Sequence, residues 1–388
     1  MKNIGSLKFS TIVDDNFKDE LINMDNDSIN QILLETFRLR SQRIIASDVL
    51  NKYINNSEFF GPSEISLKKI NAYNLVFCNS LPETYKDIDV SPINPLGTNS
   101  CISNLSQNLM LSTIKNSEVC GDPTTALTLE VAKIRKQYMN ENDCMDKTVD
   151  LATVTRVLRM QHFDKSKGYM QHFDLFGLSS GGRKEKDKNY NLLKIKEHIE
   201  IWIEFCRKLT KCGFDFGKIE VGITNINLLE HLIKNQFFKR EDITVNSLND
   251  EFDLLEENNI NLPKKIYSYS DLDNGSIELY KLYYLKKELI EIEEELIKYF
   301  EKKYPEIEFY IDLNRKAGLG YYNGLCFHIY SNKDNNIIQL ADGGATDWNQ
   351  KLLSDKKELN VTSGFGAELI LKLFGKDVTI ENLKEELW

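Results

Sequence analysis

The segment AGLGYYNGLCFHIY, residues 317–330, carries the strongest fold signal in the chain. Its first half is rich in glycine and its second half is apolar and aromatic, which is typical of a turn that leads into a buried strand. Tyr321 and Tyr322 are neighbours at the start of this strand, and neighbouring side chains on a strand point to opposite faces. We therefore expect one of these tyrosines to contact a ligand and the other to pack in the core.

Strand patterns also surround this segment. EIEFYIDLN (306–314) precedes it, NIIQLADGG (336–344) follows it, and SGFGAELILKLFGK (363–376) predicts a strand that turns into an apolar helix through its glycines. Earlier, TVTRVLRMQHFDKSKGYMQHFDLFGLSSGG (153–182) has two β-rich stretches around a charged loop, which is the pattern of a hairpin. Strands are thus expected both before and after the middle of the chain.

Helical patterns occupy the N-terminal region and the middle. Residues 1–74 predict a polar tail and then helices, the apolar run from Leu75 predicts strand and turn, and DPTTALTLEVAKIRKQYM (122–139) predicts a helix. The middle is mostly helical in pattern, with one predicted strand, KIEVGITN (218–225). This order predicts an α+β fold with a mostly antiparallel sheet flanked by helices, in which a core of residues 75–183 and 306–388 carries a mostly helical insertion, residues 184–305.

Composition narrows the class of protein. The chain has 388 residues, 41% of them hydrophobic and 28% charged, and a formal net charge of −10, which opposes unspecific attraction to phosphate backbones. Its sequence contains no apolar run of about 18 residues that would span a bilayer, and its first residues lack the pattern of a signal peptide. We therefore expect a globular protein of the cytoplasm that does not enter a membrane.

Metal and disulfide chemistry are not expected. The seven cysteines are scattered without a C-x-x-C pair, so free thiols are predicted. His162, His172 and His328 lie on predicted strands with Asp164 and Asp174 nearby, but their spacing is not that of metal ligands. Hydrogen-bonded structural histidines are the simpler interpretation.

The segment 317–330 resembles the histidine-specific signature of class II histidyl-tRNA synthetases, which usually reads R-G-L-D-Y-Y-T-G-x-x-F-E. Weaker matches follow the family's order: DPTTALTLEVA (122–132) near its Glu-x-Thr region, the hairpin as class II motif 2, DGGATD (342–347) at G-G-R-Y-D, and SGFGAELILKLF (363–374) as motif 3. The resemblance covers roughly residues 75–388 and implies a class II synthetase fold that is commonly dimeric. The chain stops just after motif 3, where the family continues into an anticodon-binding domain, and in this it also resembles the regulatory subunit of ATP phosphoribosyltransferase.

The resemblance assigns ligand-binding roles to eight positions. Arg159 stands where the motif 2 arginine meets the α-phosphate and the amino-acid carboxylate, and Phe173 stands where the family stacks adenine. A family glutamate two residues after that arginine is Gln161 here. The remaining positions belong to recognition of the amino acid, where Thr125, Tyr321 and Tyr322 match the family and Leu175 and Ser179 replace a glutamine and a glutamate.

Several charged residues of the family pattern are replaced. The motif 3 arginine aligns with Leu371, and the helix glycine before it is Glu368. Two further arginines become Ala317 and Ala345, and the signature aspartate becomes Gly320. If each lost arginine stabilised the transition state by even a few kcal/mol, adenylate formation would slow by many orders of magnitude.

The sequence therefore predicts a synthetase paralogue that binds a small molecule with a carboxylate or phosphate and an apolar or aromatic body. It is expected to act as a homodimeric regulatory or accessory subunit of a partner enzyme, without tRNA as a partner. The alternative is a ligase or transferase that activates a carboxylate with ATP and magnesium through Arg159 and Phe173. A cation from Lys165, Lys167 or Arg315 in the space left by Ala317 and Leu371 would favour that alternative.

Overall fold

The computed structural model describes residues 14–141, 144–161, 170–184, 189–246, 252–333 and 336–386. The predictions made for His162, Asp164, Lys165 and Lys167 lie outside these residues. The chain divides into two compact units, which are treated separately: a smaller one of residues 1–64, 91–122 and 156–173, and a larger one of residues 65–90, 123–155 and 174–388.

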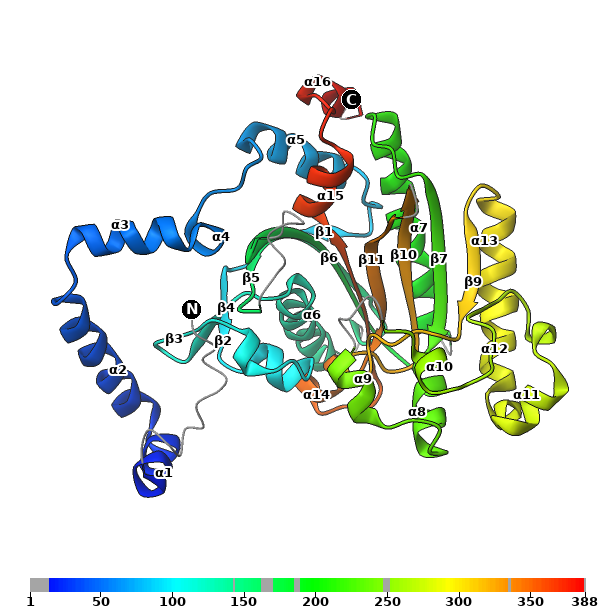
Figure 1. Ribbon diagram of the computed structural model, residues 1–388, viewed down its shortest axis with the longest axis horizontal. Coiled ribbons are helices and arrows are strands. Elements are labelled where there is room, and N and C mark those ends of the chain that lie inside the picture. Colours follow the sequence, from blue (N-terminus) through cyan, green and yellow to red (C-terminus); the bar gives the residue numbers. More distant parts are fainter. Residues whose placement is uncertain are drawn as a thin grey trace. The chain divides into compact units, whose positions relative to one another are not determined.

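A nine-stranded sheet runs through the larger unit, and the ends of two strands extend into residues of the smaller one (Figure 1). The β6–β12, β12–β11, β11–β10, β10–β7 and β9–β8 pairs are antiparallel, whereas the β1–β5 and β7–β9 pairs are parallel. The predicted mostly antiparallel α+β sheet is therefore confirmed. In spatial order the strands are β1 (Lys86–Asp87), β5 (Val149–Leu158), β6 (His172–Arg183), β12 (Glu358–Gly366), β11 (Asn336–Thr346), β10 (Leu325–Lys333), β7 (Lys218–Asn225), β9 (Glu308–Asp312) and β8 (Lys265–Ile266).

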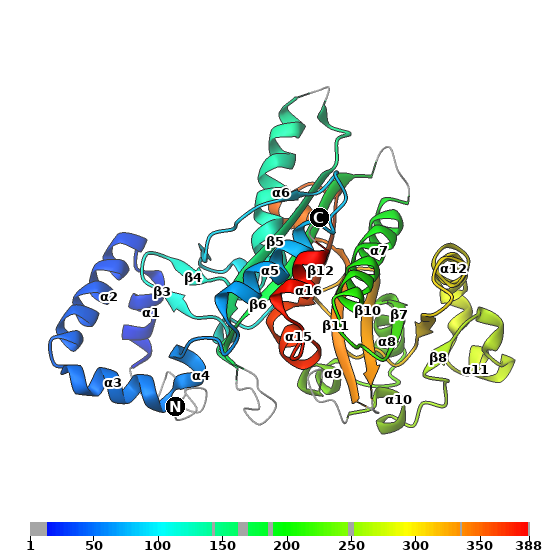
Figure 2. The ribbon, with the colours of Figure 1, turned by 90° about the horizontal axis from the view of Figure 1, so that it is seen from above.

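Two long helices, α6 (Pro123–Asn140) and α7 (Tyr190–Lys211), cover opposite faces of this sheet (Figure 2). Ser179 and Ser180 show the arrangement, because they are neighbours on β6 and point to opposite faces. The Ser179 hydroxyl bonds Thr128 of α6 at 3.0 Å, whereas the Ser180 hydroxyl bonds His198 of α7 at 3.0 Å. The core on the α7 face is aromatic and is filled by Phe77, Phe176, Trp202, Phe205 and Phe365.

The middle of the chain adds one strand and several helices to the larger unit. The predicted strand 218–225 is β7, which pairs with β10 on one side and β9 on the other. The domain boundaries proposed from the sequence stay a prediction. The helical elements here are α8 (Asn227–Lys234), α9 (Arg240–Asn246), α10 (Leu254–Glu257), α11 (Asn274–Leu279), α12 (Lys286–Ile292) and α13 (Lys298–Lys303), with short turns at Tyr269–Asp271, Leu282–Leu285 and Glu293–Ile297.

The remaining helices of the larger unit are α5 (Leu67–Cys78), α14 (Trp348–Leu353), α15 (Ala367–Phe374) and α16 (Ile380–Glu385). The prediction of strand from Leu75 is wrong at its start, because residues 75–78 form the last turn of α5. Val76 and Phe77 are completely buried there, and a short apolar run has the same pattern in a buried helix as in a buried strand. None of the helices among the described residues is long and apolar enough to cross a membrane.

The smaller unit begins with α1 (Asp15–Asn23), α2 (Asn26–Ser41), α3 (Ala46–Asn55) and α4 (Ser57–Phe60). Aspartate caps start the first two helices, since Asp14 accepts the amide of Phe17 at 2.8 Å and Asp25 accepts that of Ser28 at 2.9 Å. Its small sheet orders β2 (Ile93–Pro95), β4 (Ser117–Val119) and β3 (Ser112–Thr113), with short helical turns at Thr98–Ile102 and Gln107–Leu109.

Candidate functional site

A row of hydrogen-bonded hydroxyl and amide groups, which we call the polar file, connects the signature segment to α6 and the sheet of the larger unit. The Tyr321 hydroxyl lies 3.0 Å from the Thr124 hydroxyl, and one helical turn later Thr128 donates to the Thr124 carbonyl at 2.8 Å. Thr128 also bonds Ser179, whose hydroxyl accepts from the Asn360 amide at 3.1 Å. These contacts fix α6 against β6 and β12, because every buried polar atom named here has a partner.

The two signature tyrosines have different surroundings, but the predicted strand is wrong here, because both lie in the turn before β10, which begins at Leu325. Tyr322 is buried in the hydrophobic core, and burial raises the pKa of its hydroxyl well above the usual value. Tyr321 is half-buried, packs edge-on against Trp348 with ring centroids 4.9 Å apart, and directs its hydroxyl to Thr124. Tyr321 is therefore the better placed of the two to contact a ligand.

Three more predicted ligand-binding residues lie in the larger unit. Thr125 and Ser179 are completely buried, and Ser179 is held by Thr128 and Asn360 within the polar file. Leu175 is half-buried near the start of β6, where it pairs with Gly366. The structure thus places Thr124 and Tyr321 in direct contact, and it places Thr125 and Ser179 inside the fold.

Arg315, which lies just before the signature segment, is hydrogen-bonded to neighbouring protein groups. Arg315 is only 5% exposed and donates to the Ala317 carbonyl at 2.8 Å and to the Asp342 carboxylate at 2.7 Å. Its guanidinium also lies 3.1 Å from Nδ1 of His328 and 5.5 Å from the centre of the Tyr322 ring. Arg315 therefore lies next to Ala317, but its charge is neutralised by Asp342.

His328 stands where the family has a glutamate, and it is nearly closed to solvent. Its Nδ1 must accept from Arg315, because a guanidinium only donates, so the proton of the neutral ring is on Nε2. Burial and the Arg315 charge hold the pKa of His328 well below its usual value. Nε2 faces Asp312 at 3.4 Å, and burial raises the pKa of that carboxyl to about 6.

The positions of the lost arginines are apolar in the structure. Leu371 is 2% exposed and belongs to the hydrophobic core, and Ala345 is 1% exposed. Glu368, at the start of α15, is buried and accepts the backbone amide of Asp174 at 3.4 Å. Helix α15, which corresponds to motif 3, therefore carries the apolar Leu371 at the position where the family has the arginine that neutralises the γ-phosphate.

The motif 2 pair lies in the smaller unit. The guanidinium of Arg159 is 5.6 Å from the centre of the Phe173 ring, and its Nε donates to the Gly121 carbonyl at 3.0 Å. Gln161 is half-buried, and its carbonyl accepts from Gln171 at 3.3 Å. The structure thus brings the predicted phosphate-binding arginine and the predicted adenine-stacking ring together.

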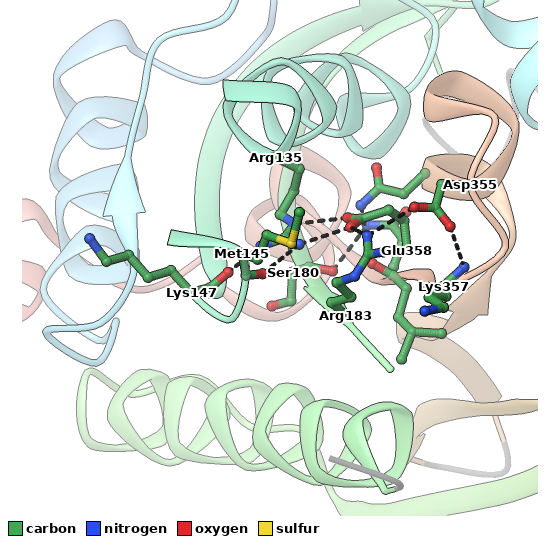
Figure 3. Close-up of polar contacts among 11 residues, drawn as sticks. Arg135, Met145, Lys147, Ser180, Arg183, Asp355, Lys357 and Glu358 are labelled. Atoms are coloured by element: carbon green, nitrogen blue, oxygen red, sulfur yellow. Dashed lines mark hydrogen bonds and ion pairs between the residues drawn. The ribbon is translucent and has the colours of Figure 1, made fainter. Parts of the chain in front are cut away.

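A buried ionic network was missed by the sequence analysis. Arg135 of α6 makes two 2.8 Å bonds to Glu358 at the start of β12, with both side chains completely buried (Figure 3). Arg183 of β6 joins Glu358 and Asp355 at 2.9 Å each. The guanidinium of Arg135 also bonds the backbone carbonyls of Met145 and Lys147. Ion pairs therefore join α6 and β6 to the start of β12. Both arginines of this network are bound by protein groups.

Other reactive groups are inert in their present surroundings. Burial raises the pKa of Cys120 to about 11 and that of Cys326 to about 12, so both remain thiols. His172 bonds Arg156 at 2.7 Å and the Gly61 carbonyl at 2.8 Å. Within the described ranges, no group of three or more His, Cys, Asp or Glu side chains is arranged to hold a metal ion.

Comparison with solved structures defines the class of this fold. An ATP phosphoribosyltransferase regulatory subunit/histidyl-tRNA synthetase from Bacillus halodurans matches with a TM-score of 0.52 at 16% identity, covering 81% of this chain and 79% of that one. A histidyl-tRNA synthetase from Nostoc sp. PCC 7120 matches with a TM-score of 0.51 at 16% identity, covering 81% and 72%. The chain has the class II aminoacyl-tRNA synthetase-like fold. No curated protein sequence matches it.

Within that class, residues 262–365 match the Histidyl-tRNA synthetase family. This stretch contains the signature segment, β9, β10 and β11. Over these residues the chain is similar to histidyl-tRNA synthetases.

Proposed function

We propose that this paralogue is a regulatory or accessory subunit that binds a small metabolite and does not charge tRNA. The observation that carries the proposal is the burial of Leu371 in the hydrophobic core at the motif 3 arginine position. Adenylate formation requires cations against a triphosphate, and a buried apolar side chain cannot supply one. A carboxylate at the start of the same helix, Glu368, would oppose a triphosphate further.

The resemblance to a regulatory subunit supports the accessory role, and it extends to a protein whose name joins both activities. A subunit of this kind transmits ligand occupancy to a partner enzyme through a free-energy coupling between two sites. We expect a homodimer that is inactive alone and that changes the activity of a partner enzyme when mixed with it.

The ligand is expected to be an anion with an apolar or aromatic part. Arg159 offers a guanidinium that can donate further hydrogen bonds to a carboxylate or phosphate, and Phe173 offers a ring for stacking. Tyr321 offers a hydroxyl from a half-buried position. These groups suit recognition of a small metabolite without requiring phosphate chemistry.

A second candidate is an enzyme that activates a carboxylate with ATP, and the contact between Arg159 and Phe173 favours it. Arg315 is adjacent to Ala317, but a phosphate would have to compete with Asp342 and His328 for its guanidinium. This candidate needs a cation at both lost arginine positions, Ala317 and Leu371. Arg315 could supply one beside Ala317, but Leu371 leaves the second position apolar.

Isothermal titration calorimetry separates the two functions. The protein is titrated with ATP·Mg, histidine and a panel of carboxylic metabolites, using Arg159→Ala and Tyr321→Phe as test variants. Arg156→Ala is the matched control, because Arg156 is an exposed arginine on β5, three residues before Arg159. Binding of one metabolite without ATP, lost in Arg159→Ala and kept in Arg156→Ala, supports the regulatory function. Binding of ATP·Mg that Arg159→Ala abolishes supports the enzyme instead.

A further inference from the structure

The sheet face under α6 has a strand position without a side chain at Gly364 of β12. Gly364 pairs with Gly177 of β6 on one side and with Asp342 of β11 on the other. Pro123 of α6 covers Gly177, since a Cβ there would lie 2.9 Å from the proline Cβ. A Cβ at Gly364 would instead meet, among the described residues, only the Phe176 carbonyl, at 3.5 Å. Space for a small group therefore remains above Gly364.

Asp342 borders this space with a carboxylate that is partly open. Its side chain is 28% exposed, whereas the side chain of its partner Arg315 is 3% exposed. Arg315 bonds one carboxylate oxygen, Oδ1, and directs further N–H groups to the Ala317 carbonyl and to His328. Within the described ranges, no hydrogen bond reaches the other oxygen, Oδ2. A group that enters the space thus meets a carboxylate oxygen, while the arginine is enclosed.

Thr362 supplies a second polar group beside the same space. It lies two residues before Gly364 on β12 and therefore on the same face of the sheet. It pairs with Ser179, whose hydroxyl contacts Thr128, so this face is the one that α6 covers. The Thr362 side chain is 1% exposed, and its hydroxyl has no hydrogen-bond partner among the described residues. A buried hydroxyl of this kind is rare in native folds, and a bound ligand would satisfy it.

The space adjoins the part of the proposed site that lies in the larger unit. Gly344, which pairs with Thr362, would bring a Cβ within 2.8 Å of the Tyr322 ring. The Tyr321 ring lies 4.8 Å from the Tyr322 ring, measured between centroids. The two tyrosines therefore border the strand positions next to Gly364, and aromatic rings attract cations as well as apolar groups.

The chemistry of these groups favours a positively charged donor. A carboxylate only accepts hydrogen bonds, and a hydroxyl can accept as well as donate. Bonds from a cationic donor to a carboxylate are among the strongest in proteins, whereas a phosphate or carboxylate would be repelled by Asp342. Ala317 and Ala345, which align with family arginines, offer no cation to reverse this preference.

We propose that the metabolite carries a positively charged amine, which binds above Gly364 with Asp342 and Thr362 as its acceptors. The inference rests on the proposed function, since it names the charge of the ligand at the part of that site in the larger unit. It adds a cationic nitrogen to the acidic group already expected of the metabolite. Arg315 is then a positioning residue that orients Asp342, rather than a cation for a phosphate.

Isothermal titration calorimetry of the full-length protein at neutral pH tests the charge of the ligand. The probes are two amines, tyramine and tryptamine, and two carboxylates with the same rings, hydroxyphenylpropionate and indolepropionate. We expect at least one amine to bind wild type with a Kd of about 1 mM or lower. Asp342→Asn removes the negative charge, so amine binding should weaken at least about tenfold. Carboxylate binding should be unchanged or tighter in the same variant.

Two further variants test the position of the amine without removing a charge. Thr362→Val deletes a hydroxyl that bonds no described protein group, so it should weaken amine binding about three- to tenfold without lowering the thermal midpoint. Gly364→Val fills the space with an apolar side chain and should abolish amine binding. Valine suits a strand, so the fold should be kept, and circular dichroism checks this.

Asp355→Asn is the matched control. Asp355 is a carboxylate with a similar exposure of 24%, and it bonds the largely buried Arg183 away from Gly364. Amine binding should be unchanged in this variant. If Asp342→Asn does not fold, because Arg315 has lost its partner, Thr362→Val and Gly364→Val still decide the proposal.

Three results would overturn the proposal. These are no amine binding to wild type up to about 10 mM, amine binding that a folded Asp342→Asn leaves unchanged, and amine binding that Gly364→Val leaves unchanged. The proposed function fails separately from this inference. ATP·Mg binding that Arg159→Ala abolishes would refute the regulatory role and leave the amine result as it is, whereas carboxylate binding without amine binding would refute only the inference.

Discussion

Arg135 and Glu358 lie 223 positions apart in the sequence and meet in a two-point ion pair that is fully closed to solvent. The pair ties α6, which carries Thr124 and Thr128, to the first residue of β12, which carries Asn360 (Figure 3). Its geometry therefore supports the polar file that reaches Tyr321. The stability of this connection is open to direct measurement.

Removing one partner of this pair should be costly. Arg135→Met leaves Glu358 buried with Arg183 as its remaining cation, and loss of one member of a buried pair costs about 3–5 kcal/mol. Urea unfolding followed by circular dichroism measures the change. Lys133→Met on the same helix removes an exposed pair with Glu130 and should cost about 1 kcal/mol or less. Equal losses in the two variants would contradict the structural role of Arg135.

Restoring the motif 3 arginine should damage the fold rather than restore ATP binding. Leu371→Arg places a charge in the apolar core, and we expect a loss of about 3 kcal/mol or more in the free energy of unfolding. Leu373→Arg is the matched control, because Leu373 is exposed on the same helix and should change stability by about 0.5 kcal/mol or less. A stable Leu371→Arg variant that gains ATP affinity in calorimetry would refute the proposed loss of synthetase chemistry.

The glycines of the signature segment should not be equivalent. Gly318 and Gly320 both have positive φ angles, +97° and +80°, so alanine strains the backbone at each by about 1–2 kcal/mol. A Cβ at Gly318 would also lie 2.6 Å from Cδ2 of the buried Tyr322, whereas a Cβ at Gly320 meets nothing within 4 Å. Gly318→Ala should therefore lower the thermal midpoint further than Gly320→Ala. Indistinguishable midpoints would show that Tyr322 can move.

Acid should weaken the fold through His198. Burial lowers the pKa of His198 to about 3, below that of the unfolded chain near 6.5. Below pH 6.5 the unfolded state takes up a proton that the folded state excludes, so stability falls as the pH drops from about 6.5 towards 3. The slope from this group is roughly 1 kcal/mol per pH unit. His198→Gln should show a shallower loss of unfolding free energy between pH 7 and pH 5 than wild type.

Local patterns predicted much of this fold. The β5–β6 hairpin, the strand that turns into α15 and the strand after the glycines of residues 317–324 each depend on residues close in sequence. The strand alternation expected at Tyr321 and Tyr322 was wrong, because both residues lie in the turn that precedes β10. Residues 75–78 were misassigned, because a four-residue apolar run has no period that separates helix from strand.

The candidate site was less accessible to sequence reasoning. Positions such as Arg159 and Phe173 could be named from the motif, and the structure places their side chains in contact. The partners of Arg315 could not, because Asp342 and His328 reach it only through the pairing of β10 with β11. Hydrogen bonds between residues this distant depend on register, which no short pattern specifies.

The order of strands in the sheet has a consequence for synthesis of the chain. β12, residues 358–366, is the last strand in sequence, yet it lies between β6 and β11 in the sheet. A nascent chain therefore carries β6 with one edge unpaired until residue 366 has left the ribosome. Contacts between strands so distant in sequence form slowly, and unpaired edges favour aggregation. The early half of this protein is expected to need protection during translation that a protein with a sequential sheet would not need.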